Sequence, residues 1–335
     1  MRIVLADQYY PHHSRRSGYG ALAAYVPARA LRADLVPWGR AAEGSRRWWI
    51  SRKLFDARVF LAALRADVLH LLYFENHLRA LPRLLRRLRP RLRLVGTLHQ
   101  PVEAEDPIRG WARLRLLDDI ITLTSGQAEE IRARLPAARV HFIPHGFVPR
   151  PETGTAGAWR TEPALQAVTV GANYRDWDAL KQIMALAAAR RADWRFHLVG
   201  LPETQKALFR SLPNAVVHPR LAEDAYFDLL DRCRALLLPM VFATANNALL
   251  EAHAAGLPAV CSALPGVADY ATSTTRTFTT PEEAVALLGA AADAPPPAHE
   301  ETRKRTAAEG QRFSWAALAP RILQVYRTED ESRRR

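Results

Sequence analysis

The feature that most constrains the fold of this chain is a regular alternation of short apolar runs with longer helix-like segments. The alternation occurs in two blocks, separated by a break rich in proline and glycine at residues 149–157. Short apolar runs between helical segments are typical of a parallel sheet covered by helices on both faces. Two such blocks in 335 residues therefore predict an α/β protein with two Rossmann-like, doubly wound domains joined by a linker.

The expected elements follow from this pattern. In the first block we expect strands at 2–6, 68–72, 93–98, 120–124 and 140–143, and helices at 21–31, 54–66 and 127–134. In the second block we expect strands at 166–170, 195–199, 215–218, 235–238 and 259–261, a proline-rich loop at 294–300, and helices at 303–311 and 316–326. Ligands of open α/β sheets collect at the carboxyl ends of the strands, so two facing domains predict a ligand in a central cleft.

Composition narrows the class of protein. Hydrophobic residues make up 49% of the chain and charged residues 24%, as in soluble globular proteins. The run Met1–Asp7 is too short and too soon charged for a signal peptide, and it reads as a first strand. Two cysteines, Cys233 and Cys261, support neither a disulfide framework nor a zinc site built from cysteine, and we read both as buried apolar residues. We therefore expect a cytoplasmic enzyme. The sequence also offers no convincing aspartate-rich metal site, and we expect no metal and no cofactor.

The net charge of +13 predicts attraction to anionic surfaces. Residues 79–93 contain seven arginines and no acid, with leucines at helical spacing among them. One interpretation is a helix resting on anionic lipid at the inner face of a membrane. The other is the solvated helix face of an arginine-rich protein. We expect no nucleic acid as partner, because the aromatic and basic modules of nucleic-acid binding are missing.

The clearest functional pattern lies at residues 244–260, after the apolar strand at 235–238. Thr244, Asn246 and Asn247 stand where a helix should begin, and they would leave its first backbone N–H groups free to bind phosphate at the positive end of the helix dipole. Helix capping is the alternative role of the two asparagines, and it is compatible with anion binding.

Glu251 lies one turn further along the same helix. Its carboxylate can accept hydrogen bonds from vicinal hydroxyls such as those of a ribose. The alternative is a surface glutamate that the helix dipole favours. A phosphate site beside an acceptor for a diol predicts a nucleotide-sugar ligand.

Two further groups of residues lie near expected strand ends. His99 follows the strand at 93–98, and the alternative to a functional role is a hydrogen-bonded turn histidine. Aromatic residues at 73–77 can stack on sugar faces, and Glu75 and Asn76 within this segment could orient an acceptor hydroxyl or simply pack in a loop.

His13 belongs to a basic cluster just before Gly18 and Gly20. A glycine loop ahead of a helix lets the backbone approach a ligand. The cluster could therefore contact an acceptor phosphate, or it could be exposed to solvent.

Four pieces of the sequence, in this order and spacing, resemble the two-domain GT-B glycosyltransferases of the family 4 type, the glycosyl transferases group 1. The pieces are the N-terminal strand with its glycine loop at 3–20, the turn Ile143-Pro144-His145-Gly146, the segment Val170-Gly171 with Arg175 and Lys181, and the donor helix with Gly256-Leu257-Pro258. The resemblance spans roughly residues 1–327.

The resemblance implies three structural parts and a reaction. Residues 1–152 would form an acceptor-side domain, 160–312 a nucleotide-sugar-binding domain, and 313–327 a helix that crosses back to the first domain. The reaction would be transfer of a sugar, of hexosyltransferase type, from a nucleotide-sugar to an acceptor hydroxyl, with retention at the anomeric carbon and without a metal. The acceptor could be a lipid-linked sugar, a polysaccharide, a protein or a small metabolite.

The resemblance also implies roles for individual residues. Arg175 and Lys181 would stabilise the negative charge of the departing diphosphate. His99 would contact the donor sugar or the reaction centre. Gly18, Gly20 and Gly171 would bring backbone close to the donor, together with the residues of the 244–251 segment.

The sequence departs from the family at one position. The family commonly has two glutamates eight positions apart, and Glu251 matches the second, whereas Ala243 stands at the first. The departure bears on the choice of donor sugar and on activity. Two alternatives stay open beside the transferase: a nucleotide-sugar epimerase, which shares the GT-B architecture, and an inactive GT-B paralogue that acts as a partner subunit, which Ala243 allows.

Overall fold

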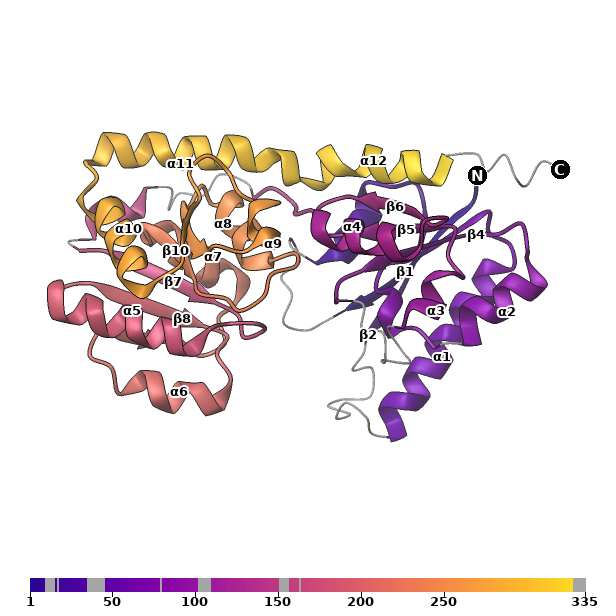
Figure 1. The fold of residues 1–335 in the computed structure, drawn as a ribbon, viewed down its shortest axis with the longest axis horizontal. Helices are drawn as coiled ribbons and strands as arrows, with labels where there is room; N and C mark the ends of the chain where they lie inside the picture. The colour runs from indigo at the N-terminus through magenta and orange to yellow at the C-terminus, as the bar shows by residue number, and fades with distance from the viewer. Residues whose placement is uncertain are drawn as a thin grey trace. The chain divides into compact units, whose positions relative to one another are not determined.

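A computed structural model of the chain describes residues 1–9, 16, 18–34, 46–78, 80–101, 110–150, 157–162 and 164–327. Contacts within the chain divide it into two compact units. Unit 1 comprises Met1–Val148 together with the chain from Phe313 onward, and unit 2 comprises Pro149–Arg312 (Figure 1). The limits expected from the sequence lie close by, at residues 152 and 313.

Unit 1 contains a six-stranded parallel sheet in the order β2-β1-β3-β4-β5-β6. Its strands are β1 (Ile3–Tyr9), β2 (Arg29–Asp34), β3 (Val68–Leu71), β4 (Arg93–Leu98), β5 (Asp119–Thr122) and β6 (Arg139–Phe142). Its helices are η1 (Tyr19–Ala24), α1 (Arg46–Ala63), η2 (Phe74–Asn76), α2 (Ala80–Leu88), α3 (Trp111–Leu114), α4 (Ser125–Arg134) and α12 (Trp315–Arg327). Strands β3, β4 and β5 are buried along their whole length, which explains why most of their side chains are apolar.

Unit 2 repeats this plan with the order β12-β11-β10-β7-β8-β9, which is the strand order of a dinucleotide-binding Rossmann sheet. Its strands are β7 (Gln166–Val170), β8 (Arg195–Val199), β9 (Ala215–Val217), β10 (Ala235–Leu238), β11 (Ala259–Ser262) and β12 (Arg276–Phe278). Its helices are η3 (Ala158–Thr161), α5 (Trp177–Arg190), α6 (Glu203–Arg210), α7 (Glu223–Arg232), α8 (Asn247–Ala254), α9 (Pro265–Ala268), α10 (Pro281–Asp293) and α11 (Pro296–Gly310), and η4 (Gln311–Phe313) spans the junction with unit 1. The predicted fold class is therefore confirmed as two parallel sheets with flanking helices.

Two expected elements were wrong. The helix predicted at 21–31 is instead the short 3-10 helix η1 followed by strand β2. Pro27 explains the difference, because it lacks an N–H group and disfavours helical geometry at the preceding Val26. Beyond η1 the chain is therefore free to extend and pair with β1.

The second wrong expectation is the proline-rich loop at 294–300. Helix α11 already begins at Pro296, with Pro295 as its N-cap residue. Proline is well suited to the first turn of a helix, where its missing N–H group would have no intrahelical acceptor. The prolines therefore start this helix, and the expected helix at 303–311 is its second half.

Helix α12 completes the core of unit 1. The backbone N–H of Phe147 donates to the carbonyl of Phe313, and that of Trp315 donates to the carbonyl of Phe147. Trp315 is fully buried, and a Cβ atom on Gly146 would lie 2.4 Å from its ring. The tight turn at 143–146 therefore needs glycine at position 146 so that the indole can pack against the backbone.

Within the described part of the chain, no helix combines the length and the apolar character that a membrane span requires.

Candidate functional site

The topology of unit 2 directs attention to the carboxyl ends of β7 and β10. These strands are neighbours in the sheet, and the chain leaves them in opposite directions across it. At such a switch point the loops after the two strands part and leave a crevice in which ligands bind. The loop after β7 carries Gly171 and Arg175, and the loop after β10 leads into α8 with Asn246 and Glu251.

Arg175 is fixed by its own loop. Its Nε and Nη2 atoms donate to the carbonyl of Val170 over 3.0 and 2.5 Å, and its Nη1 donates to the carbonyl of Asn173 over 3.0 Å. Gly171 has φ +84°, and a Cβ atom there would be 3.2 Å from the guanidinium. Burial lowers the pKa of Arg175 to about 10, so the side chain remains a cation at neutral pH.

The two loops are joined by backbone hydrogen bonds. The N–H of Val241 donates to the carbonyl of Tyr174, and the N–H of Asp176 donates to the carbonyl of Pro239. The Asp176 carboxylate also accepts from the N–H of Ala179 and caps α5. A positive charge is therefore held in place at the ends of both strands by contacts that need no ligand.

Asn246 is the N-cap residue of α8. Its Oδ1 accepts from the N–H groups of Ala248 and Leu249 over 3.0 and 3.4 Å, and its Nδ2 donates to the sulfur of Met240. The prediction that the first N–H groups of this helix are free is therefore wrong for these two. No described hydrogen bond uses the backbone N–H of Thr244 or Asn247, which lie at the same positive end of the helix.

Glu251 is buried on α8, and the hydroxyl of Tyr226 on α7 donates to its Oε2 over 2.8 Å. Burial and the neighbouring Glu251 raise the pKa of Tyr226 well above its usual value, while Arg175 acts in the opposite sense. The tyrosine therefore keeps its proton and orients the carboxylate. Tyr226 was not predicted, since it lies 25 positions before Glu251 outside any motif.

Of the remaining predicted residues of this unit, Thr244 and Asn247 lie beside the N-cap of α8 and Lys181 stands apart. Lys181 is exposed on α5, and none of the described contacts joins it to Arg175 or Glu251. Ala243 is buried, and its backbone packs closely against Gly266. A Cβ atom on Gly266 would lie 2.1 Å from the carbonyl oxygen of Ala243.

The predicted residues of unit 1 gather around Tyr19 at the ends of β3 and β4. The Tyr19 ring is fully buried and is met edge-on by five other rings within 6.4 Å, those of His70, Tyr73, His99, His145 and Trp315. Gly20 follows it, and the Asp7 carboxylate occupies the space where a side chain at position 20 would stand. Gly18 is the N-cap residue of η1. His13 lies outside the described residues.

His99 is partly exposed and stacks on Tyr73 with 4.1 Å between ring centroids. Its Nε2 lies 2.8 Å from the carbonyl of Leu72, so the ring donates there and the neutral form carries its proton on Nε2. Glu75 is buried, and its Oε1 accepts from the backbone N–H of His99 over 3.0 Å. Asn76 is half-buried at the end of η2. These contacts fix the turn that carries His99.

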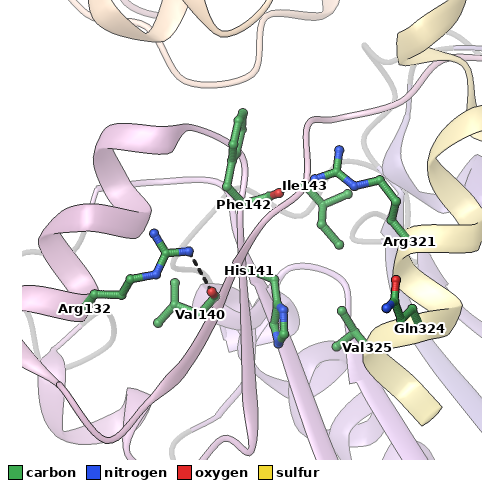
Figure 2. A pocket seen from close by; sticks show the side chains of 8 residues that line it. All are labelled: Arg132, Val140, His141, Phe142, Ile143, Arg321, Gln324 and Val325. Carbon is green, nitrogen blue, oxygen red and sulfur yellow. Dashed lines mark hydrogen bonds between the residues drawn. The ribbon is translucent and has the colours of Figure 1, made fainter. Parts of the chain in front are cut away.

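A separate hollow of about 350 Å³ lies in unit 1 between α4, β6 and α12 (Figure 2). Arg132 and Arg321 approach it from opposite sides and donate to the outward carbonyls of Val140 and Phe142 on the edge strand β6. His141 is bonded to Asp119. The basic side chains therefore cover the exposed edge of the sheet, which opposes pairing with another chain.

Comparison with known proteins matches one segment of the chain to a family model and supports the fold of the whole chain. Residues 166–294, from β7 to the end of α10, match the family model described as glycosyl transferases group 1. No curated protein matches the chain. Among solved structures, sucrose-phosphate synthase from Thermosynechococcus elongatus is 17% identical with a TM-score of 0.70, and the match covers 97% of this chain and 98% of that one.

Two further structures match. HepE of Anabaena, in complex with UDP and glucose, is 12% identical with a TM-score of 0.68, covering 98% of this chain and 100% of that one. S. aureus TarM, in complex with UDP, alpha-GlcNAc-glycerol and Fondaparinux, is 10% identical with a TM-score of 0.62 over 78% of this chain. This chain spans 55% of the length of TarM. The two six-stranded parallel sheets and these matches identify the fold as the GT-B fold of two Rossmann-like domains.

Proposed function

We propose that this chain is a glycosyltransferase that moves a sugar, of hexosyl type, from a nucleotide-sugar to an acceptor hydroxyl. The observation that carries the proposal is the fixed group of Arg175, Tyr226 and Glu251 at the switch point of unit 2. This group lies inside the segment that matches the glycosyl transferases group 1 model. The UDP and sugar bound to HepE support a nucleotide-sugar as the ligand class.

Each member of the group has a role in the proposal. Glu251 accepts hydrogen bonds from the ribose hydroxyls, and Tyr226 holds the carboxylate in place. Arg175 uses three of its five N–H groups in the described bonds, so donors remain for an oxygen of the diphosphate. The backbone N–H groups of Thr244 and Asn247 add further donors at the helix end.

In the proposed reaction the acceptor oxygen forms a bond to the anomeric carbon as the bond from that carbon to the phosphate oxygen breaks. The acceptor hydroxyl gives its proton to the departing diphosphate on the same face, so the configuration is retained. The fixed cation Arg175 stabilises the charge that develops on the leaving group, with no metal required. Exposed Lys181 would join it only after moving, and His99 would contact the donor sugar.

The first experiment is thermal unfolding of the full chain with a panel of nucleoside diphosphates and nucleotide-sugars. A ligand that binds the native state raises the melting temperature, and we expect this for one base. Glu251→Gln should lower the affinity for that ligand by roughly 10- to 150-fold, because it removes hydrogen bonds to a charged acceptor worth about 1.5–3 kcal/mol. Glu282→Gln, on the first turn of α10, is the matched control and should bind as the wild type does.

Incubation of the identified donor with candidate acceptors then tests the chemistry. We expect the donor's anomeric configuration in the product and unchanged turnover in excess EDTA. Isomerised donor in the absence of acceptor would indicate the epimerase instead, and binding without turnover would indicate a partner subunit. If no nucleotide or nucleotide-sugar of the panel raised the melting temperature, the proposed donor site would be refuted.

A further inference from the structure

Helix α1 carries an apolar stripe on its solvent side, in addition to the apolar side that faces the core. Ile50, Leu54 and Leu61 each expose between 44% and 64% of their surface, although side chains of this kind are usually buried. The opposite side of the helix already packs in the core of unit 1 through residues such as Phe55. The exposed stripe is therefore additional to what the fold requires.

The charges on α1 border this stripe. At about 100° per residue, Ala57, Ile50, Leu61 and Leu54 fall within roughly 60° of one another around the helix. Lys53 and Arg46 lie on one side of them, and Arg58 lies on the other. Asp56, the acidic residue of this helix, is on the buried side, where its carboxylate binds His77 and the N–H of Leu78.

The neighbouring helix α2 repeats this combination. It packs against α1, as Figure 1 shows, and exposes Leu84 and Leu88 beside Arg83 and Arg87. Other arginines of the basic run are bound inside the unit: Arg86 to Asp118, Arg89 to the carbonyl of Ala66, and Arg93 to Asp119. Among the side chains that the structure describes on α1 and α2, every exposed charged one is basic.

We propose that α1 and α2 form a lipid-binding surface that attaches unit 1 to an anionic bilayer. An apolar stripe bordered by lysine and arginine is the pattern of a helix lying in a bilayer interface, where apolar side chains enter the acyl boundary and the cations meet anionic headgroups. A nucleic acid would satisfy the cations but leave the apolar stripe in water. This inference does not depend on the proposed transfer reaction.

The test is sedimentation of the full chain with vesicles. We expect binding to vesicles that contain phosphatidylglycerol, little binding to phosphatidylcholine alone, and release by salt. The double substitution Ile50→Ser with Leu54→Ser should reduce binding at least about tenfold, because two side chains no longer enter the bilayer. Lys53→Glu with Arg58→Glu should abolish the preference for anionic lipid. Leu208→Ser, exposed on α6 of unit 2, is the matched control and should bind normally.

Melting temperatures of the variants establish that each is folded, which is expected because the substituted side chains are exposed. Equal binding by the wild type and the α1 variants would overturn the proposal, as would the absence of binding to either vesicle. A wild-type dimer that the serine variant converts to a monomer, with vesicle binding unchanged, would also overturn it, since the stripe would then join two copies.

Discussion

At the scale of single residues, Tyr226 shows how a side chain outside any motif can position one inside a motif. Its hydroxyl donates to Glu251, and the pair is buried. We expect Tyr226→Phe to lower the affinity for the nucleoside diphosphate that stabilises the wild type by about fivefold, because a hydrogen bond worth about 1 kcal/mol is lost. Because Glu251 would then be less well oriented toward the ribose, discrimination against the 2′-deoxy ligand should also fall. Titration calorimetry with both ligands measures this.

The control for Tyr226→Phe is Tyr25→Phe, which removes a hydroxyl from half-buried Tyr25 in unit 1. It should bind both ligands as the wild type does. Equal weakening of the ribose and deoxyribose ligands by Tyr226→Phe would indicate a role for Tyr226 in packing alone.

Gly146 and Gly126 allow a matched test of backbone space. A Cβ atom at position 146 would lie 2.4 Å from the buried ring of Trp315, whereas at position 126 nothing lies within 4 Å. We expect Gly146→Ala to lower the free energy of unfolding by about 1–3 kcal/mol, since the indole must shift in a packed core. Gly126→Ala, inside α4, should leave it unchanged or raise it by up to about 1 kcal/mol. Urea unfolding of both variants would contradict this if they lost equal stability.

At the scale of elements, the start of α8 combines a cap with a proposed phosphate site. Asn246→Ala removes the cap and should lower the free energy of unfolding by about 0.5–2 kcal/mol. Asn246→Asp should keep the cap and the stability but weaken the binding of the nucleoside diphosphate, because it places a negative charge beside the phosphates. Thermal unfolding with and without the ligand separates the two effects.

Thr280→Ala is the control for the cap, since it opens the capping box of α10 away from the proposed site. It should lose stability without a change in the ligand's affinity. Unchanged affinity in Asn246→Asp would place the phosphates elsewhere.

The elements also show what local patterns miss. The structure has the predicted strand at 235–238 and the predicted helix start with its cap at 246–254. These features could be predicted because apolar periodicity and capping residues act over a few positions. Strand β2 was missed because its six residues include two arginines and an aspartate and pair only with β1 at the edge of the sheet. Its place depends on that partner rather than on its own apolar pattern.

At the scale of the whole molecule, buried neutral histidines should make stability depend on pH. Burial lowers the pKa of His70 to about 3 and those of His145 and His253 to about 4. In the unfolded chain these groups titrate near 6.5. Their contribution to the free energy of unfolding is therefore fully present above pH 6.5. It is lost as the pH falls toward 4, by about 1.4 kcal/mol per pH unit for each histidine.

Urea unfolding between pH 7.5 and 5 measures this loss, in a range above the usual carboxylate pKa values. Proton NMR of the imidazoles provides the control, since His70 should remain neutral throughout. A constant unfolding midpoint would contradict the expectation.

The return of the chain to unit 1 gives a second prediction at this scale. Trp315, Ile322 and Tyr326 of α12 are buried, and the hydroxyl of Tyr326 lies 2.6 Å from Nδ1 of His70. Loss of buried side chains of this size costs about 2–5 kcal/mol each, which together is comparable to the whole stability of a domain. A chain ended after Arg312 should therefore lose hydrogen-exchange protection in β1, β3 and β4 but keep it in β7 and β10.

A chain ended after Arg327 retains α12 and should keep the protection of both sheets. Preserved protection of β1 in the shorter chain would show that unit 1 does not need this helix.

The sequence by itself determined where most strands lie along the chain, the two-block α/β plan, and the position of Glu251 on the helix after β10. These features depend on apolar periodicity and turn residues, which act over neighbouring positions. Only the tertiary structure decided that Tyr226 orients Glu251, that Asn246 occupies two helix N–H groups, and that Lys181 stands apart. It also decided which arginines are bound inside unit 1 and which border the stripe of α1. These outcomes depend on contacts between residues far apart in the chain, and no local pattern encodes such contacts.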